Sequence, residues 1–158
     1  QPQSILMIGS SILIKQMIGL GLKPRKTFND DPFPNVPTEM MPHFVRGYLD
    51  GDGCISVSSK GVCSVSFVGS PKFIVGLCDG LVGLVGMRTP AIQLYGKKTK
   101  WSTIAWYSLE DLRLFYDFVY SSDHFCLERK KEKLVKWLSE PRWGRGHFFG
   151  NSSTGPLK

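Results

Sequence analysis

The sequence has few of the residues that build thiolate metal centres or disulfide frameworks. Its 158 residues include four cysteines and three histidines. The cysteines are Cys54, Cys63, Cys78 and Cys126, and they form no CxxC pair and stand beside no cluster of histidines. This spacing argues against a structural zinc site and is typical of reduced thiols in an intracellular protein.

Acidic residues are also scarce relative to basic ones. Lys and Arg number 20 against 13 Asp and Glu, which gives a formal net charge of +7 and a pI of about 9.3. A positive balance of this size suits a polyanionic partner, although it can also serve solubility alone. The hydrophobic fraction of 42% is enough for a folded core, and the length suits one compact domain or a little more.

No apolar run is long enough to suggest a membrane segment. Residues 4–22 come nearest, but Lys15 and Gln16 interrupt them and the stretch is short for a bilayer. No basic segment precedes it and no small-residue cleavage site follows it, which argues against a signal peptide. We expect instead a short buried strand at Ile5–Ile8, then a helix from Ser11 to Leu20, with Ser10 as its N-cap.

Residues 44–53, Phe-Val-Arg-Gly-Tyr-Leu-Asp-Gly-Asp-Gly, read as a helix that ends in two carboxylates. Apolar and aromatic side chains fall on one side of it, and Gly47 stands where a larger side chain would keep a second helix at a distance. Asp50 and Asp52 are each followed by glycine. Because an unpaired buried carboxylate is costly, the pattern predicts a pair of helices that brings acids to a metal ion.

Val45 to Gly53 resembles the signature of the LAGLIDADG homing endonucleases, with the mid-helix glycine and the terminal Asp-Gly-Asp-Gly in register. Gly19–Thr27 with Phe33-Pro34, and residues 118–131, resemble segments that flank the motif in this family. The resemblance covers roughly Lys23 to Leu138. It implies an α+β fold of order αββαββα with an antiparallel sheet that forms a saddle on double-stranded DNA. It also implies a site-specific DNA endonuclease from a mobile genetic element such as an intron.

After the motif, apolar and polar residues alternate with period two, which predicts strands. We expect strands at 54–60, 62–68, 91–97 and 101–107, and helices at Pro71–Val85, Leu109–Tyr120 and Leu127–Leu138. One face of the sheet would be apolar and the other small, polar and basic. The inward residues would be Ile55, Val57, Val65, Phe67, Ile92, Leu94, Ile104 and Trp106.

The polar face is the candidate DNA-binding surface. A curved antiparallel ribbon can enter the major groove, where each base pair presents a distinct pattern of donors and acceptors. The residues predicted to contact DNA are Ser56, Ser58, Lys60, Ser64, Ser66, Gln93, Tyr95, Lys97, Lys98, Lys100, Thr103 and Tyr107. Gln93 is the best adenine reader, and the lysines would lie near phosphates. An ordinary half-solvated antiparallel sheet would show the same alternation, so the pattern alone leaves function open.

The resemblance also assigns chemical roles. It implies that Asp52 binds a divalent metal ion, Mg²⁺ or Mn²⁺, with possible help from the carbonyl of Gly51. Asp50 is a candidate third ligand, although it fits better as a residue that positions the helix end. Lys130 would polarise the scissile phosphate or a bridging water. Ser70 stands nearest the place where some relatives carry a water-ordering glutamine, and its hydroxyl could hold water.

The resemblance further implies two motif helices, one for each DNA strand. Phe44, Gly47 and Tyr48 would line the interface between them. The partner would be a second copy of this chain or a separate LAGLIDADG half, since residues 1–42 resemble the tail of a preceding repeat. Residues 43–140 would form the endonuclease domain, and residues 141–158 a basic and aromatic tail that grips nucleic acid or folds back on the core.

Residues 4–21 and 64–86 share one order of features: a strand, a Gly-Ser turn, an apolar helix and a glycine. A relationship between two repeats would explain this echo. Chance would explain it equally well, because amphipathic helices with Gly-Ser caps often look alike.

Two other functions remain open. One is an RNA maturase, or another RNA-binding protein that reuses the fold without cutting. The other is a DNA-binding protein in which the acids are relics, although both acids are present here. In each case we expect an intracellular location, in the cytoplasm or nucleoid of a bacterium or a phage-infected cell, or in an organelle.

Overall fold

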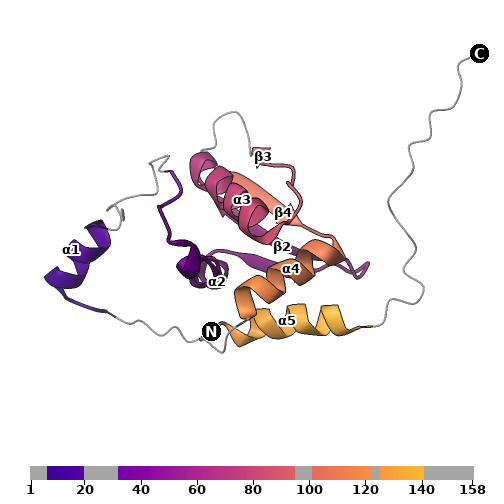
Figure 1. The fold of residues 1–158 in the computed structure, drawn as a ribbon. Helices are drawn as coiled ribbons and strands as arrows, with labels where there is room; N and C mark the ends of the chain where they lie inside the picture. Colours follow the sequence, from indigo (N-terminus) through magenta and orange to yellow (C-terminus); the bar gives the residue numbers. More distant parts are fainter. Residues whose placement is uncertain (1–6, 20–31, 95–100, 122–124, 141–158) are drawn as a thin grey trace, which may run out of the picture.

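The computed structural model describes residues 7–19, 32–94, 101–121 and 125–140 (Figure 1). Several predictions fall outside these ranges. They concern Tyr95, Lys97, Lys98 and Lys100, and the tail at 141–158.

The order of elements agrees with the predicted fold class. The elements are α1 (Ser11–Gly19), the 3-10 helix η2 (Thr38–Met40), α2 (Met41–Gly51), β1 (Cys54–Val57), β2 (Cys63–Gly69), α3 (Pro71–Val85), β3 (Gln93–Leu94), β4 (Ser102–Trp106), α4 (Leu109–Tyr120) and α5 (Glu128–Ser139). From α2 to α4 the order is αββαββα, and α5 follows. The predicted α+β fold is confirmed, as are the bounds of α3 and α4.

The four strands form one antiparallel sheet in the order β1-β2-β4-β3. The predicted first strand was too long. β1 ends at Val57 because Ser58 opens a turn that closes through Gly61, whose φ is +76°. Of the predicted third strand the structure describes residues 91–94. Gln93 and Leu94 pair, whereas Ile92, expected to point inward, precedes the strand and is 40% exposed.

The core lies between the apolar face of the sheet and the helices α3 and α4 (Figure 1). The strand residues predicted to point inward are buried at Ile55, Val65, Phe67, Ile104 and Trp106. Val57 lies at the end of β1 and is 43% exposed, so its predicted burial is wrong. Burial of apolar side chains from strands and helices together supplies the main driving force for this packing.

The junction of α3, β4 and α4 is fixed by a buried carboxylate. α3 ends at Gly86, whose φ is +77°, and Ser108 caps α4 by accepting a hydrogen bond from the backbone of Asp111. Asp111 in turn accepts bonds from the Arg88 backbone (2.9 Å) and guanidinium (3.1 Å). Burial alone would raise the Asp111 pKa, but the hydrogen bonds from Arg88 and Ser108, with the Arg88 charge, lower it.

The N-terminal segment departs from two expectations. Met7 and Ile8 form no strand and are 85% and 63% exposed, so a buried strand is wrong at these residues. α1 begins at Ser11 as predicted, and Ser10 accepts a hydrogen bond from the Leu13 backbone, yet no residue of α1 is buried. None of the helices in the described ranges is both long and apolar enough to cross a membrane.

The helix predicted at residues 44–53 begins earlier in the structure. η2 leads directly into α2 at Met41, and Pro42 occupies the first turn, where its missing N–H costs nothing. Phe33 packs edge-on against Phe44, with a centroid distance of 5.3 Å. A Cβ at Gly76 of α3 would lie 2.2 Å from the Phe33 Cβ, so glycine is needed there for Phe33 to fit.

Candidate functional site

The candidate site is built on the C-terminal end of α2. Val45 and Leu49 are fully buried, and the Arg46 guanidinium donates to the carbonyl of Val119 in α4 (2.8 Å). The end of the helix is closed by Gly53, whose N–H donates to Leu49. A Cβ at Gly53 would lie 2.8 Å from the Leu49 Cα, so glycine is required for this close approach. The residues between Leu49 and Gly53 therefore have a fixed place.

The two aspartates of the motif face different surroundings. Asp52 is exposed, and its carboxylate makes no hydrogen bond or ion pair with any residue in the described ranges. Asp50 turns inward: its Oδ2 accepts a hydrogen bond from the backbone N–H of Leu127 (2.9 Å), just before α5. Its Oδ1 is buried without a partner among the described residues. Only the Asp52 carboxylate is thus placed to meet a ligand in solvent.

Lys130 lies inside the molecule, with a relative exposure of 6%. Its Nζ donates to the carbonyls of Leu49 (2.5 Å), Asp50 (3.1 Å) and Gly53 (2.6 Å). An ammonium group has three protons, and here each has a carbonyl acceptor. The role of Lys130 at a phosphate stays a prediction, while the contacts seen are with the end of α2.

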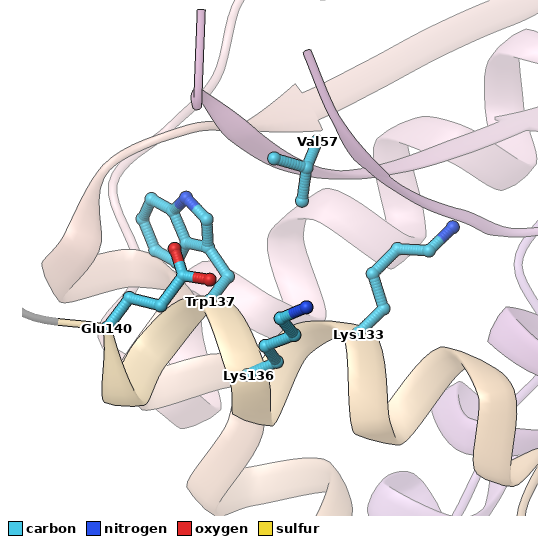
Figure 2. A pocket seen from close by; sticks show the side chains of 5 residues that line it. All are labelled: Val57, Lys133, Lys136, Trp137 and Glu140. Atoms are coloured by element: carbon cyan, nitrogen blue, oxygen red, sulfur yellow. The ribbon is translucent and has the colours of Figure 1, made fainter. Parts of the chain in front are cut away.

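α5 continues along the outer edge of the sheet. β1 is an edge strand, and Lys133 of α5 donates to the carbonyl of Ile55 (3.1 Å), while Trp137 donates to that of Gly61 (2.8 Å). Between α5 and β1 lies a groove of about 300 Å³ (Figure 2). Its lining residues are Val57, Lys133, Lys136, Trp137 and Glu140. α5 thereby covers backbone groups that an open edge would leave unpaired.

One face of α2 is aromatic and contacts the chain's own core. The Tyr48 hydroxyl donates to the carbonyl of Val68 (2.6 Å), and its ring stacks on Phe67 at 5.8 Å. Burial, and then the charge of Asp52, raise the pKa of Tyr48 to about 12. Phe44 contacts both Phe33 and Phe73. Two of the three predicted interface residues, Phe44 and Tyr48, are therefore half-buried within the chain itself.

Another face of α2 is open. Gly47 is exposed, and a Cβ built on it would have no atom of the described chain within 4 Å. The same holds for Gly51, one helical turn later, which sequence reasoning considered only for its carbonyl. The four-residue spacing of these glycines was the signal that could have identified a continuous open face.

The polar face of the sheet brings several predicted residues together. Ser56 lies opposite Ser64, and their hydroxyls are 2.9 Å apart. Ser66 is paired with Cys54 on one side and with Ala105 on the other. Cys54 and Ala105 were not among the residues predicted to contact DNA, although the period-two pattern places both on this face.

Gln93 and Thr103 are paired at the far edge of this face, and Thr103 is also paired with Val68 of β2. Gln93 is exposed and Thr103 is half-buried. A single polar face thus extends from β1 to β3 in the observed register.

Other predicted residues lie at the margins. Ser58 is in the turn after β1, where its hydroxyl accepts a hydrogen bond from the Val62 backbone (3.1 Å), and Lys60 is exposed in the same turn. Tyr107 follows β4 and is 54% exposed. Ser70 is the N-cap residue of α3 at the end of β2.

A divalent metal ion finds hard oxygen donors at the end of α2, but few of them. Asp52 offers a carboxylate, and the exposed Gly51 offers a carbonyl from the last turn of the helix. The described residues contain no group of three His, Cys, Asp or Glu side chains that could hold a metal. Mg²⁺ usually takes only one or two carboxylates and keeps several waters. The donors therefore fit a site to which one chain contributes part of the ligands.

Comparison with solved structures finds a similar fold in several homing endonucleases. I-SmaMI bound to uncleavable DNA aligns with a TM-score of 0.48 and 16% identity, over 85% of this chain and 44% of that chain. I-CvuI in complex with a DNA target aligns at 0.47 and 14%, over 64% of this chain and 65% of that chain. I-TnaI aligns at 0.44 and 17%, over 61% and 67%.

I-CvuI and I-TnaI are homing endonucleases, and I-SmaMI is a LAGLIDADG homing endonuclease. At such identities the likeness concerns the fold alone. The chain spans less than two thirds of the length of I-CvuI and less than half of the length of I-SmaMI. No protein-family model and no curated protein matches the sequence.

Proposed function

We propose that this chain is one half of a metal-dependent, site-specific double-strand DNA endonuclease. The observation that carries the proposal is the exposed carboxylate of Asp52, held in place by the glycine-closed end of α2. The resemblance of Val45–Gly53 to the LAGLIDADG signature supports it, as does the polar face of the sheet.

Phosphodiester hydrolysis needs an activated water, relief of charge on the phosphorane and a stabilised leaving oxygen, all of which a bound Mg²⁺ or Mn²⁺ supplies. In this chain Asp52 would hold the ion, and the Gly51 carbonyl would add a neutral oxygen. Ser70, at the start of α3, offers a hydroxyl that can hold a water molecule by hydrogen bonding.

DNA would bind along the polar face of the sheet. Ser56, Ser64, Ser66, Gln93 and Thr103 occupy this face and can exchange hydrogen bonds with base edges in the major groove. Lys60, exposed in the turn after β1, is suited to a phosphate contact. The net charge of +7 favours the same partner.

The open face of α2 favours pairing with a second motif helix. Gly47 and Gly51 carry no side chain that would hold a partner helix away, and small residues at this spacing allow close helix contact. A second helix would also bring a second Asp52-type carboxylate, and this would add to the few metal ligands that the described residues of one chain offer.

The segment around α1 resembles the segment around α3, as the tail of another repeat would. Gly9-Ser10 precedes α1 as Gly69-Ser70 precedes α3, so the two segments match with a constant offset. In that register Met17 corresponds to Leu77, which is fully buried, whereas Met17 is 41% exposed. We therefore assign residues 1–42 to the lead-in from another repeat, and residues 43–140 to the endonuclease domain.

The test combines solution mass with cleavage. Light scattering of the chain, with and without duplex DNA and Mg²⁺, should show the mass of a pair. The chain should cut members of a randomised duplex pool. Asp52→Asn should lower the cleavage rate roughly a thousandfold, since several kcal/mol of charge stabilisation would be lost. Binding should persist, and the control Asp79→Asn, at an exposed acid of α3, should cut normally.

Cleavage by Asp52→Asn at the wild-type rate would contradict the metal assignment. Binding of structured RNA or of DNA by the wild-type chain, without cleavage in Mg²⁺ or Mn²⁺, would favour the maturase or the non-cleaving binder instead.

A further inference from the structure

The ends of α2 and α5 exchange contacts that join parts of the chain about 80 residues apart. Asp50, in the last turn of α2, accepts a hydrogen bond from the backbone of Leu127 at the start of α5. Lys130, in the first turn of α5, donates to three carbonyls at the end of α2. Each helix thus supplies a charged group to the end of the other helix.

The charges of this exchange match the helix dipoles. The N-terminus of α5 carries unpaired N–H groups and a partial positive charge, which a carboxylate stabilises. The C-terminus of α2 carries unpaired carbonyls and a partial negative charge, which an ammonium group stabilises. Asp50 and Lys130 therefore give charged hydrogen-bond partners to backbone groups at the ends of the two helices.

Asp52 lies within the span that this exchange fixes. Lys130 holds the carbonyls of Leu49 and Asp50 before it and the carbonyl of Gly53 after it. The Asp52 backbone itself donates to Tyr48 (2.9 Å). The side chain of Asp52 is left to solvent while the backbone on both sides is held by one buried ammonium group.

We propose that Asp50 and Lys130 form a positioning pair that sets the place of Asp52, and that neither contacts metal or phosphate. All three ammonium protons of Lys130 have carbonyl acceptors, so none remains for a phosphate. Asp50 has one oxygen bonded to Leu127 and the other buried, so neither faces the solvent side where Asp52 lies. This inference rests on the proposed function only for the reaction that Asp52 serves; the contact itself stands without it.

The main test uses Lys130→Met, which keeps most of the side-chain length and removes the three donors. Lys136→Met, at an exposed residue of the same helix, is the control. Amide hydrogen exchange in the full chain reports the pair without any cleavage assay. We expect exchange at Asp52, Gly53 and Leu127 to accelerate roughly tenfold or more in Lys130→Met, since several buried groups lose their partners. The control should leave these amides at wild-type rates.

Cleavage adds a second readout. A displaced Asp52 should raise the Mg²⁺ concentration for half-maximal cleavage about tenfold, since loss of a residue that orients a metal ligand typically weakens metal binding by this factor. DNA affinity should stay unchanged. Lys130→Arg separates the two roles of the lysine. Arginine binds phosphate well, so it would restore a direct phosphate contact, but its planar fork does not fit three converging carbonyls. We expect Lys130→Arg to resemble Lys130→Met.

Wild-type exchange at all three amides in Lys130→Met would overturn the proposal. So would a slower cleavage step with unchanged Mg²⁺ dependence that Lys130→Arg restores. If Lys130→Met fails to fold, Asp50→Leu takes its place, because leucine has a similar size and no acceptor for the Leu127 N–H. Faster exchange at Leu127 is the expected result, and unchanged exchange there overturns the pair. A wild-type chain that never cuts would reject the proposed function, while the exchange data would still decide the pair.

Discussion

The inner and open sides of the end of α2 differ in almost every physical respect. The inner side, made of Asp50 and Gly53 with Lys130, is charged, largely buried and hydrogen-bonded to backbone groups. The open side, made of Gly47, Gly51 and Asp52, is exposed, and its two glycines carry no side chain that would keep a partner helix at a distance. The end of α2 is thus held by hydrogen bonds on one side and open on the other.

This difference shows how two aspartates with nearly identical local sequence come to have different surroundings. Both are followed by glycine, yet Asp50 points toward α5 and Asp52 toward solvent. Residues two apart in a helix are separated by about 200° around the axis, so they cannot face the same neighbour. The inner carboxylate is hydrogen-bonded to the start of α5, and the open one is exposed.

The largest effect on stability is expected from a single methyl group on the inner side. Gly53→Ala places a Cβ 2.8 Å from the Leu49 Cα, so the backbone must shift and the free energy of unfolding should fall by about 1–3 kcal/mol. Gly51→Ala adds the same methyl group on the open side, where no described atom lies within 4 Å. Because alanine favours helix, Gly51→Ala should change stability by less than about 1 kcal/mol, in the stabilising direction.

Urea unfolding of both variants at one temperature measures this contrast. Equal losses for Gly53→Ala and Gly51→Ala would mean that the two sides do not differ in packing.

A smaller effect is expected at Tyr48, whose hydroxyl donates to Val68 of β2. Tyr48→Phe removes this bond and should cost about 1 kcal/mol. Burial and then the Asp52 charge raise the Tyr48 pKa from 10.0 to about 12. Across this pH window the unfolded chain loses the proton while the folded chain keeps it, so stability falls as pH rises. The alkaline fall should be shallower in Tyr48→Phe.

Unfolding curves recorded below and within that window test the prediction. Tyr107→Phe, at an exposed tyrosine, should match wild type in both. An unchanged alkaline slope in Tyr48→Phe would assign the loss of stability to other groups, such as Tyr120, whose pKa is also raised by burial and by the Asp50 charge.

Much of the fold could be predicted because its signals are local. Ser70 with Pro71 marks the start of α3, and Gly86 its end, by the ordinary preferences of helix caps. Alternation with period two separated the buried face from the polar face, and the register pairs Ser56 with Ser64 as a shared polar face requires.

The contacts that a local pattern cannot encode were missed. Lys130 shares a helical face with Leu134 and Trp137, and this face is buried. The acceptors of its ammonium group are carbonyls at the end of α2, about 80 residues away in the sequence, so no local pattern reveals them. The end of β1 depends on the Ser58 hydroxyl, which accepts from the Val62 backbone and closes a turn instead of extending the strand. α2 begins at Met41, before the predicted start at Phe44, because a proline such as Pro42 is tolerated in the first turn of a helix.

Gly47→Leu should have the smallest effect on folding stability and the largest effect on the pairing of two chains. Gly47→Leu fills the open side, where no described atom lies within 4 Å, so the folded chain can accept it. Leucine is the better helix former, and stability should rise by less than about 1 kcal/mol. A second helix could no longer approach closely, and light scattering should then show single chains. Gly83→Leu is a matched control, since Gly83 is also a helical, exposed glycine without neighbours, and its mass should equal that of wild type. A pair that persists in Gly47→Leu would place the interface elsewhere and leave the open side of α2 without its proposed partner.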